Sequence, residues 1–245
     1  MSFETLSGIV LRYTDYRDND RILTLLTKER GLVSVTARAV RAKSKSDQGL
    51  VKDAYCYGEF VVYERNGIEY VSASSVIEAF YPIREDYDRL VAAAQTANIA
   101  HIVADGHSSG ELFSLLYHTL SFIAYTETDP HDLVLCFLAK SLSAAGYEPL
   151  ITRCAGCGKS VLDEHSIAFS NTQGGSLCAN CRGGEKTYSP LALELIRRML
   201  ILPDYSMHKV RLKKPAGDEI DKLLFSYAEF VLERSVRLKN SARTE

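Results

Sequence analysis

The first 80 residues alternate short apolar runs with turn signals, a pattern that predicts an all-β domain. Strands are marked by alternating apolar positions or by short runs rich in Val, Ile, Tyr and Phe. Such runs predict five strands, over residues 8–11, 22–27, 32–37, 55–63 and 70–77. Turn residues separate them at 18–20, at Arg30-Gly31 and at Asn66-Gly67, the last being a strong hairpin dipeptide. Five short strands at this spacing suit a small barrel or sandwich, and the polar stretch 41–53 is expected to be a loop.

Beyond Pro82 the apolar positions recur at helical spacing. They predict helices over residues 87–104, 111–125, 130–146, 190–202 and 220–232. Asp129-Pro130 and Ser189-Pro190 each place a capping side chain before a proline, a combination that starts helices. Gly146 is positioned to end the third helix.

The order of these elements predicts an α+β protein of four segments. Residues 1–80 form a β-domain, and residues 81–150 and 187–245 form the first and second parts of a helical bundle. Residues 151–186 hold a pair of cysteine motifs and interrupt the helical part. We therefore expect this cysteine module to be inserted in the bundle rather than linked to it as a separate domain.

Composition adds a location and a charge pattern to this outline. The 245 residues contain no apolar run near the length of about 20 residues that a membrane helix needs, and no secretory leader is evident. We therefore expect a cytoplasmic protein, where cysteines stay reduced, and expect Cys56 and Cys136 to be buried thiols. The net charge is −2, but residues 84–149 hold three basic and nine acidic residues, and residues 187–245 hold eleven and eight. This asymmetry permits a local surface for an anionic ligand without establishing one.

The most specific motif is a pair of C-x-x-C sequences, Cys154-Ala-Gly-Cys157 and Cys178-Ala-Asn-Cys181. Zn²⁺ favours four thiolates in a tetrahedron, and each C-x-x-C turn brings two sulfurs to one side of the ion. Redox thiols are the alternative, but they predict one active pair at the start of a helix rather than two pairs. Because four protein ligands leave no position for water, the motif predicts one structural zinc ion per chain.

Motifs for catalysis are weak. A zinc deaminase needs H-x-E and a proline before its C-x-x-C, whereas Leu177 precedes Cys178 and no histidine has glutamate two residues later. Gly158-Lys159-Ser160 is similar to the end of a phosphate-binding loop, but Arg153 stands where that loop requires glycine. We therefore expect that the protein is not an enzyme, and we keep a zinc-dependent enzyme as the least favoured alternative.

A basic cluster lies at the end of the third predicted strand: Arg38, Arg41, Lys43 and Lys45. On a small barrel, aromatic side chains can stack on the bases of a single strand while neighbouring basic side chains bind its phosphates. The aromatic residues of this domain are Tyr13, Tyr16, Tyr55, Tyr57, Phe60, Tyr63 and Tyr70. The alternative remains open, because tyrosines pack well in strands and a charged run is usually a solvated loop.

Several blocks follow one another along the chain in a specific order. They are Gly8-Ile-Val-Leu11 through Tyr16, Asp20-Arg21 through Thr27, Glu29-Arg30-Gly31 through Arg38, Phe137 through Leu142, Ala145-Gly146-Tyr147-Glu-Pro149-Leu150 leading to Cys154, and Gly174-Gly175 before Cys178. Together they cover almost the whole chain and resemble the bacterial recombination and repair mediator family RecO. The order of the blocks is the specific part of this resemblance.

This resemblance implies an N-terminal OB-fold, a helical bundle and a zinc module. It also implies binding of single- and double-stranded DNA, annealing of complementary strands, and help in loading RecA onto SSB-coated DNA with RecR, as in the RecFOR pathway. The implied partners are DNA, RecR and the C-terminal tail of SSB, and the implied place is the nucleoid. Carried over to this chain, the DNA-binding candidates are Arg12, Arg21, Arg38, Arg41, Lys43 and Lys45. The alternative function is a zinc-containing adaptor that binds proteins through its acidic helical segment and binds DNA only weakly.

Overall fold

The computed structural model describes residues 2–17, 19–40, 53–104, 110–238 of the chain. The chain divides into two compact units, Met1–Tyr125 and Thr126–Glu245. This division falls inside the segment 81–150 for which one helical part is predicted, and the four-segment outline given above stays a prediction. Within the described residues, no helix combines the length and the apolar character needed to cross a membrane.

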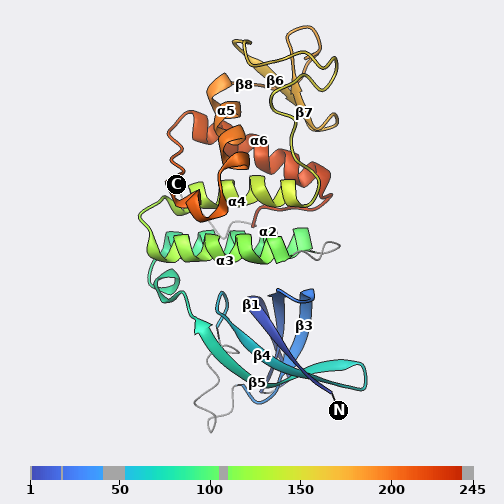
Figure 1. The fold of residues 1–245 in the computed structure, drawn as a ribbon, viewed down its shortest axis with the longest axis vertical. Coiled ribbons are helices and arrows are strands. Elements are labelled where there is room, and N and C mark those ends of the chain that lie inside the picture. Colours follow the sequence, from blue (N-terminus) through green and yellow to red (C-terminus); the bar gives the residue numbers. More distant parts are fainter. Residues whose placement is uncertain (1, 18, 41–52, 105–109, 239–245) are drawn as a thin grey trace. The chain divides into compact units, whose positions relative to one another are not determined.

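The first unit opens with a closed five-stranded barrel (Figure 1). Its strands are β1 (Phe3–Tyr16), β2 (Asp20–Thr27), β3 (Gly31–Ala37), β4 (Tyr57–Arg65) and β5 (Ile68–Glu78). They are ordered β1-β2-β3-β5-β4, with β4 pairing back to β1 and a parallel contact between β3 and β5. A five-stranded barrel of this kind is the OB-fold, so the fold class predicted from the sequence is confirmed.

The barrel closes around side chains that alternate along each strand. Leu6, Leu23, Val35, Phe60 and Val62 are among the buried core residues, while their neighbours in sequence face outward. The hairpin between β4 and β5 turns at Asn66-Gly67, where both residues have positive φ, at 56° and 75°. Positive φ at both central residues is the geometry of a type I′ turn, which explains the hairpin signal in the sequence.

Two helices follow the barrel in the first unit. After the short 3-10 helix η1 (Tyr81–Arg84), α2 (Tyr87–Ala104) and α3 (Gly110–Tyr125) pack against each other, and both contact the barrel strands. The rings of Tyr57 and Phe113 meet edge to face at a centroid distance of 5.7 Å. Arg84 donates to the backbone oxygens of Ala54 and Ala79 and to the sulfur of Cys56, which fixes the connection between barrel and helices.

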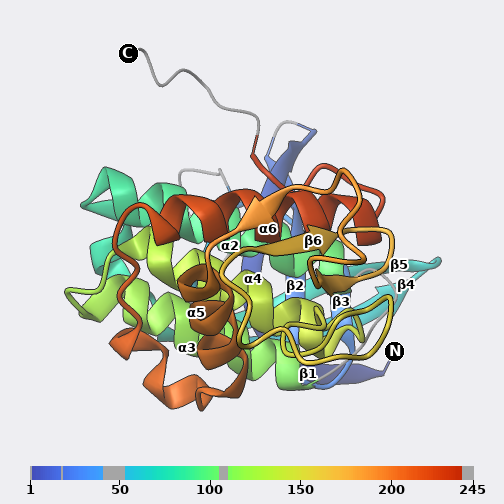
Figure 2. The same cartoon turned by 90° about the horizontal axis from the view of Figure 1, so that it is seen from above.

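The second unit contains three helices that contact one another (Figure 2). They are α4 (Pro130–Ala144), α5 (Pro190–Ile201) and α6 (Ala216–Val231), with the 3-10 helix η2 (Asp204–Lys209) between the last two. All residues of α4 from Asp132 to Ala139 are buried, so α4 is the central helix of this unit. In Figure 2 the axis of α5 runs across that of α6.

The predicted helix ends are confirmed by their hydrogen bonds. The Asp129 side chain accepts from His131 N at 2.9 Å, and Ser189 Oγ accepts from Ala192 N at 3.2 Å. Gly146 has a φ of 84°, and Gly146 N and Tyr147 N donate to the carbonyls of Ser143 and Leu142. This pair of bonds is the Schellman motif, which ends a helix by satisfying its last carbonyl groups.

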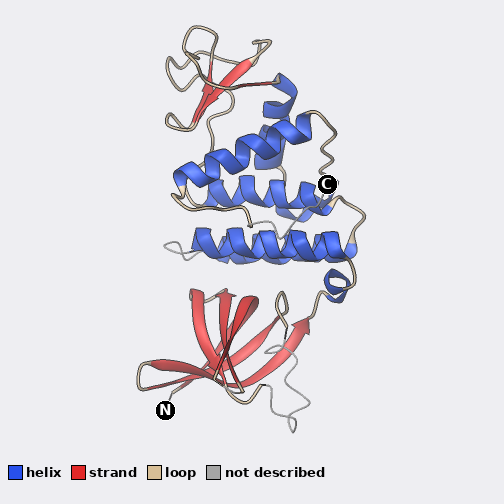
Figure 3. Ribbon diagram, turned by 180° about the vertical axis from the view of Figure 1, so that it is seen from behind, coloured by secondary structure: helices blue, strands red, loops and turns tan. Residues whose placement is uncertain are grey.

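A small sheet separates α4 from α5 along the chain. It contains β6 (Ile167–Ser170), β7 (Gly175–Leu177) and β8 (Thr187–Tyr188) in the order β7-β6-β8. Figure 3 shows the strands of the chain in two groups, the barrel and this sheet. Cys56 and Cys136 are buried as expected, and burial raises the pKa of both thiols, that of Cys136 to about 12.

Candidate metal centre and nucleic-acid interface

The four sulfurs of the two C-x-x-C motifs lie within 4.8 Å of one another in the second unit. Cys157 and Cys178, one from each motif, have their sulfurs 3.7 Å apart. Cys154 and Cys178 are buried, Cys181 is half-buried and Cys157 is exposed. The structure therefore brings the two motifs together as a group that can hold one metal ion.

The first motif forms a tight turn after α4. Cys154 N donates to Lys159 O at 2.7 Å, and Gly158 N donates to Cys154 O at 2.8 Å. Gly158 has a φ of 76°, a backbone conformation that is strained for any residue with a side chain. A Cβ on Gly156 would lie 3.3 Å from Cys181 Sγ, so glycine leaves room for the second motif.

The second motif follows β7. Cys181 N and Arg182 N both donate to Cys178 O at 3.0 Å, which folds this C-x-x-C into a turn like the first. Ala155 N donates to Ser176 O at 2.8 Å and ties the first turn to β7. Backbone hydrogen bonds therefore shape each turn, and one of them connects the first turn to the strand that leads into the second.

Electrostatics explain why this group suits a cation. Burial opposes ionisation of Cys154, but hydrogen bonds from the backbone of Cys178, Cys157 and Gly156 lower the pKa of its thiol to about 6. Hydrogen bonds with the other three sulfurs raise the pKa of Cys181 to about 12. One thiolate forms readily here, while hydrogen bonds between the sulfurs hold the proton of Cys181. Four fully ionised sulfurs at this separation would repel one another. A divalent metal that favours tetrahedral thiolate ligands would relieve that repulsion.

The barrel carries three of the six predicted DNA-binding residues among the described ones. Arg12 is exposed on β1; its Nε donates to Thr24 Oγ1 at 3.4 Å, and its Nη2 lies 2.9 Å from His101 Nε2. Neither partner is an acid, so the positive charge of Arg12 is not neutralised by these contacts. Arg21 differs: its side chain is only 14% exposed, its Nε is 2.8 Å from Asp15, and its guanidinium covers the ring of Tyr13.

Arg38 directly follows β3 and is exposed. Its guanidinium carbon lies 4.0 Å from the centre of the Tyr70 ring. A hydrogen bond with Tyr70 raises the pKa of this guanidinium above its ordinary value. The remaining candidates, Arg41, Lys43 and Lys45, lie outside the described residues.

An open groove of about 590 Å³ lies beside the β4–β5 hairpin. In the OB-fold, the face of the second and third strands and the neighbouring loops form the ligand-binding surface. This groove occupies that surface, because its lining residues come from the end of β1, from β2 and β3, from the turn between them, and from the hairpin: Tyr16, Ile22, Arg30, Ser34, Thr36, Glu64, Gly67, Ile68 and Glu69.

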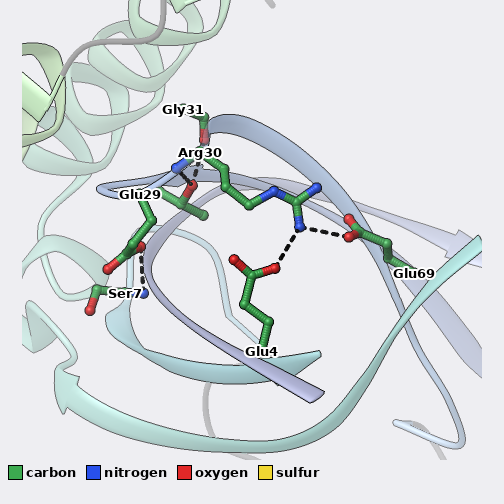
Figure 4. A network of polar contacts seen from close by, with 7 residues as sticks. Glu4, Ser7, Glu29, Arg30, Gly31 and Glu69 are labelled. Carbon is green, nitrogen blue, oxygen red and sulfur yellow. Dashed lines mark hydrogen bonds and ion pairs between the residues drawn. The ribbon is translucent and has the colours of Figure 1, made fainter. Parts of the chain in front are cut away.

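Arg30 is the basic residue of this lining, and two acids hold it (Figure 4). Its Nη1 lies 2.7 Å from a carboxylate oxygen of Glu69 and 3.2 Å from one of Glu4. The hydrogen bond with Glu69 makes the largest contribution to raising the pKa of Arg30, and the charges of both carboxylates raise it further. The turn that presents Arg30 is itself fixed, because Arg30 N donates to the hydroxyl of Thr27. Sequence reasoning missed this cluster, since the two carboxylates are 26 and 39 residues away in the chain.

The aromatic residues of the barrel fall into different environments. Phe60 is completely buried in the core, so it is not available to a nucleobase. Tyr57 contacts α3, whereas Tyr63 and Tyr70 are stacked on the outer face at a centroid distance of 5.6 Å. Phe3, which sequence reasoning did not single out, adds a third ring next to Tyr63.

Comparison with protein families matches both parts of the chain. Residues 1–80 match the model described as Recombination protein O N terminal, and residues 84–241 match Recombination protein O C terminal. The first match coincides with the barrel, and the second contains the four cysteines.

Curated relatives are similar along most of their length. A protein named DNA repair protein RecO from Desulforamulus reducens is 31% identical over 241 residues, which cover 97% of this chain and 93% of the relative. Its namesake from Anaeromyxobacter sp. strain K is 34% identical over 235 residues, covering 94% and 91%. The one from Acetivibrio thermocellus is 32% identical over 187 residues, covering 76% and 73%.

Proposed function

Because this chain belongs to the RecO family of DNA repair proteins, we propose that it is a recombination mediator that binds single- and double-stranded DNA and anneals complementary strands. The observation that carries this proposal is an OB-fold barrel with the exposed arginines Arg12 and Arg38 on it. Neither arginine has a carboxylate as its main partner. Such cations capture phosphates by releasing the counterions that surround DNA.

Annealing is consistent with capture through a few cations. A protein that neutralises phosphates on two strands lowers the repulsion between them, and it still leaves base edges free to pair. Because these contacts are electrostatic, the proposed binding is reversible and weakens as salt is added. A mediator needs this reversibility because it must release the paired product.

We further propose that Cys154, Cys157, Cys178 and Cys181 hold one structural Zn²⁺. The four sulfurs are crowded together, and the group found among the described residues consists of cysteines alone. Both features support a closed thiolate site, in which no ligand position is left for substrate. The ion would stabilise the sheet between α4 and α5. The proposal gives the protein no catalytic step.

The proposed mediator helps load RecA on SSB-coated DNA together with RecR, and works on chromosomal DNA in the cytoplasm. A group of exposed basic residues in the second unit supports the C-terminal tail of SSB as a partner, because that tail is an acidic peptide. Lys209, Arg211, Lys213 and Lys214 are exposed within one short segment. Arg211 donates to Thr128 Oγ1 and to the carbonyl oxygens of His208 and Val210, so these contacts leave its charge uncompensated.

The test of DNA binding compares three arginine variants in gel shifts with single and double strands at two salt concentrations. Arg12→Gln and Arg38→Gln should each weaken binding and reduce the slope of log affinity against log salt by about 1. Arg21→Gln is the matched control from the same barrel, because Asp15 and Tyr13 already occupy that side chain. It should change DNA affinity less.

A double variant decides the location of the site. If Arg12→Gln with Arg38→Gln left affinity and salt slope unchanged, the barrel would not be the DNA-binding surface. If the wild-type chain bound an SSB-tail peptide but neither form of DNA, the adaptor function would replace the mediator function.

A further inference from the structure

Three aromatic side chains form a continuous row across three neighbouring strands of the barrel. Phe3 on β1 pairs in register with Tyr63 on β4, and Tyr63 pairs with Tyr70 on β5. Their ring centroids are 5.7 and 5.6 Å apart. We call Phe3, Tyr63 and Tyr70 the aromatic row.

The aromatic row lies on the outer face of the barrel. Side chains alternate along a strand, and Val62 and Val71, which are in register next to the row, belong to the core or pack against it. Tyr63 and Tyr70 are half-buried, whereas Phe3 is 59% exposed, a large value for a phenylalanine. The Phe3 end therefore offers an accessible apolar ring.

The guanidinium group of Arg38 lies at the other end of the row, over Tyr70. The guanidinium of Arg38 lies over the Tyr70 ring at 4.0 Å, a distance at which the ring quadrupole attracts the charge. Tyr70 also pairs in register with Thr36, which lines the groove beside the hairpin. The row thus extends from this groove to the edge of the barrel at Phe3.

Acidic residues restrict what this surface can bind. Each ring has a glutamate as its neighbour in sequence: Glu4 follows Phe3, Glu64 follows Tyr63, and Glu69 precedes Tyr70. Arg30 offsets the charges of Glu4 and Glu69 through its two ion pairs (Figure 4). Because side chains alternate along a strand, these carboxylates lie on the face opposite to the rings, with Glu4 in register with Val62 of the core. Their charge still disfavours a phosphate backbone laid along the row, but it does not oppose the flat, uncharged face of a base.

We propose that the aromatic row is a stacking site for unpaired nucleobases, with Phe3 as the accessible ring and Arg38 holding an adjacent phosphate. This inference rests on the proposed DNA binding and deepens it. Bases in a duplex are already stacked on their neighbours and are not free to lie on Phe3. The aromatic row therefore favours single strands, whereas the arginines alone attract both forms of DNA.

The competing explanation is that the row only stabilises the barrel, since cross-strand aromatic pairs contribute to sheet stability. The two explanations differ in one measurable respect. A stacking site distinguishes a strand with bases from a strand of equal charge without bases, whereas a structural cluster does not.

The experiment uses the full chain and fluorescence anisotropy with three probes: a short oligothymidylate, an abasic oligonucleotide of the same length, and a hairpin duplex. The wild-type chain should bind oligothymidylate more tightly than the abasic strand. Phe3→Leu keeps an apolar side chain but removes the ring, and should weaken oligothymidylate binding by about 5-fold or more, the lower end of what one stacked base contributes. Abasic and duplex affinities should stay within about 2-fold, because the cations are unchanged.

Tyr87→Leu is the matched control, since Tyr87 is 71% exposed in the same unit at the start of α2 and does not belong to the row. Equal affinity of the wild-type chain for the two single strands would overturn the stacking site and leave DNA binding by the barrel intact. So would a Phe3→Leu variant that lost thermal stability but kept the wild-type ratio between the two probes, or one no different from Tyr87→Leu. Failure of the wild-type chain to bind any probe would overturn the proposed function together with this inference.

Discussion

At Gly175, the first residue of β7, the structure leaves no room for a side chain. A Cβ built there would lie 2.7 Å from Leu150 Cβ and 2.8 Å from Leu150 O. The segments are this close because Leu150 and Gly175 form a parallel bridge, with Leu150 N donating to Gly174 O and Ser176 N donating to Leu150 O. We predict that Gly175→Ala detaches β7 from the segment that leads into the first cysteine turn.

The magnitude follows from these distances. Restoring an ordinary carbon contact of 3.4 Å needs a displacement of roughly 0.7 Å, and the hydrogen bonds of 3.0 and 2.8 Å would lengthen with it. Overpacking of this kind costs about 1–3 kcal/mol, and each weakened backbone hydrogen bond costs up to about 1 kcal/mol more. We therefore expect the free energy of unfolding of the cysteine module to fall by about 2–4 kcal/mol.

The assay measures metal retention and local opening. Because Ser176 also accepts from Ala155 in the first cysteine turn, the displacement should separate the two C-x-x-C turns. Zinc release to a chromogenic chelator should be faster in Gly175→Ala than in the wild-type chain, and amide exchange over residues 150–182 should increase. Gly184→Ala is the matched control, because a Cβ there meets nothing within 4 Å. It should leave both measurements unchanged.

If the Gly175→Ala chain retained zinc and exchanged its amides at the wild-type rate, glycine would not be required at this position and the reasoning would be refuted. If Gly184→Ala accelerated zinc release as much as Gly175→Ala, the effect would come from loop entropy and not from the contact with Leu150.

Three further changes test other parts of the second unit. Cys178→Ser should abolish metal binding and lower the stability of the module while DNA affinity, measured by gel shift on folded protein, is largely kept; loss of DNA binding in a chain with unchanged circular dichroism would contradict an indirect role for the metal. Ser189→Ala removes the cap of α5 and should lower the free energy of unfolding by about 1 kcal/mol in urea titrations; an unchanged midpoint would mean that water replaces the cap. Burial alone would raise the pKa of Asp221, but hydrogen bonds from His131 and Arg237 lower it below 3.8. Its stabilising contribution is therefore present above that pH and is lost as pH falls through the folded-state pKa. The stability difference between the wild-type chain and Asp221→Asn should accordingly shrink in urea titrations between about pH 5 and about pH 3, and a constant difference would contradict the assigned ion pairs.

The helix ends could be predicted from the sequence because capping is local. Asp129, Ser189 and Gly146 each satisfy backbone groups within a few residues, so their roles depend on their neighbours in the chain and not on the fold. The same holds for Asn66-Gly67, whose positive φ values are a property of the turn itself. Strand positions were predictable because alternation of side chains identifies a two-sided sheet.

The sequence by itself also determined the two sulfur pairs of the proposed metal site, since each C-x-x-C spacing places two sulfurs together wherever the chain folds. Only the tertiary structure decided which of the predicted cations are accessible. Arg12 and Arg21 are both strand arginines in the sequence, yet Asp15 and Tyr13 cover Arg21, whereas Arg12 contacts Thr24 and His101, neither of which is an acid. Such differences depend on register and barrel closure.

The aromatic row and the Arg30 cluster were decided by tertiary structure for the same reason. Phe3 contacts Tyr63 only because β4 pairs with β1 and closes the barrel. Arg30 likewise contacts Glu4 on β1 and Glu69 on β5 only because the folded barrel brings these strands close to the turn that holds Arg30. Pairing between distant strands is selected by the packing of the whole core, which no short stretch of sequence specifies. Local chemistry therefore determined the elements and the cysteine pairs of the proposed metal site, while the closed barrel determined which side chains lie together on its surface.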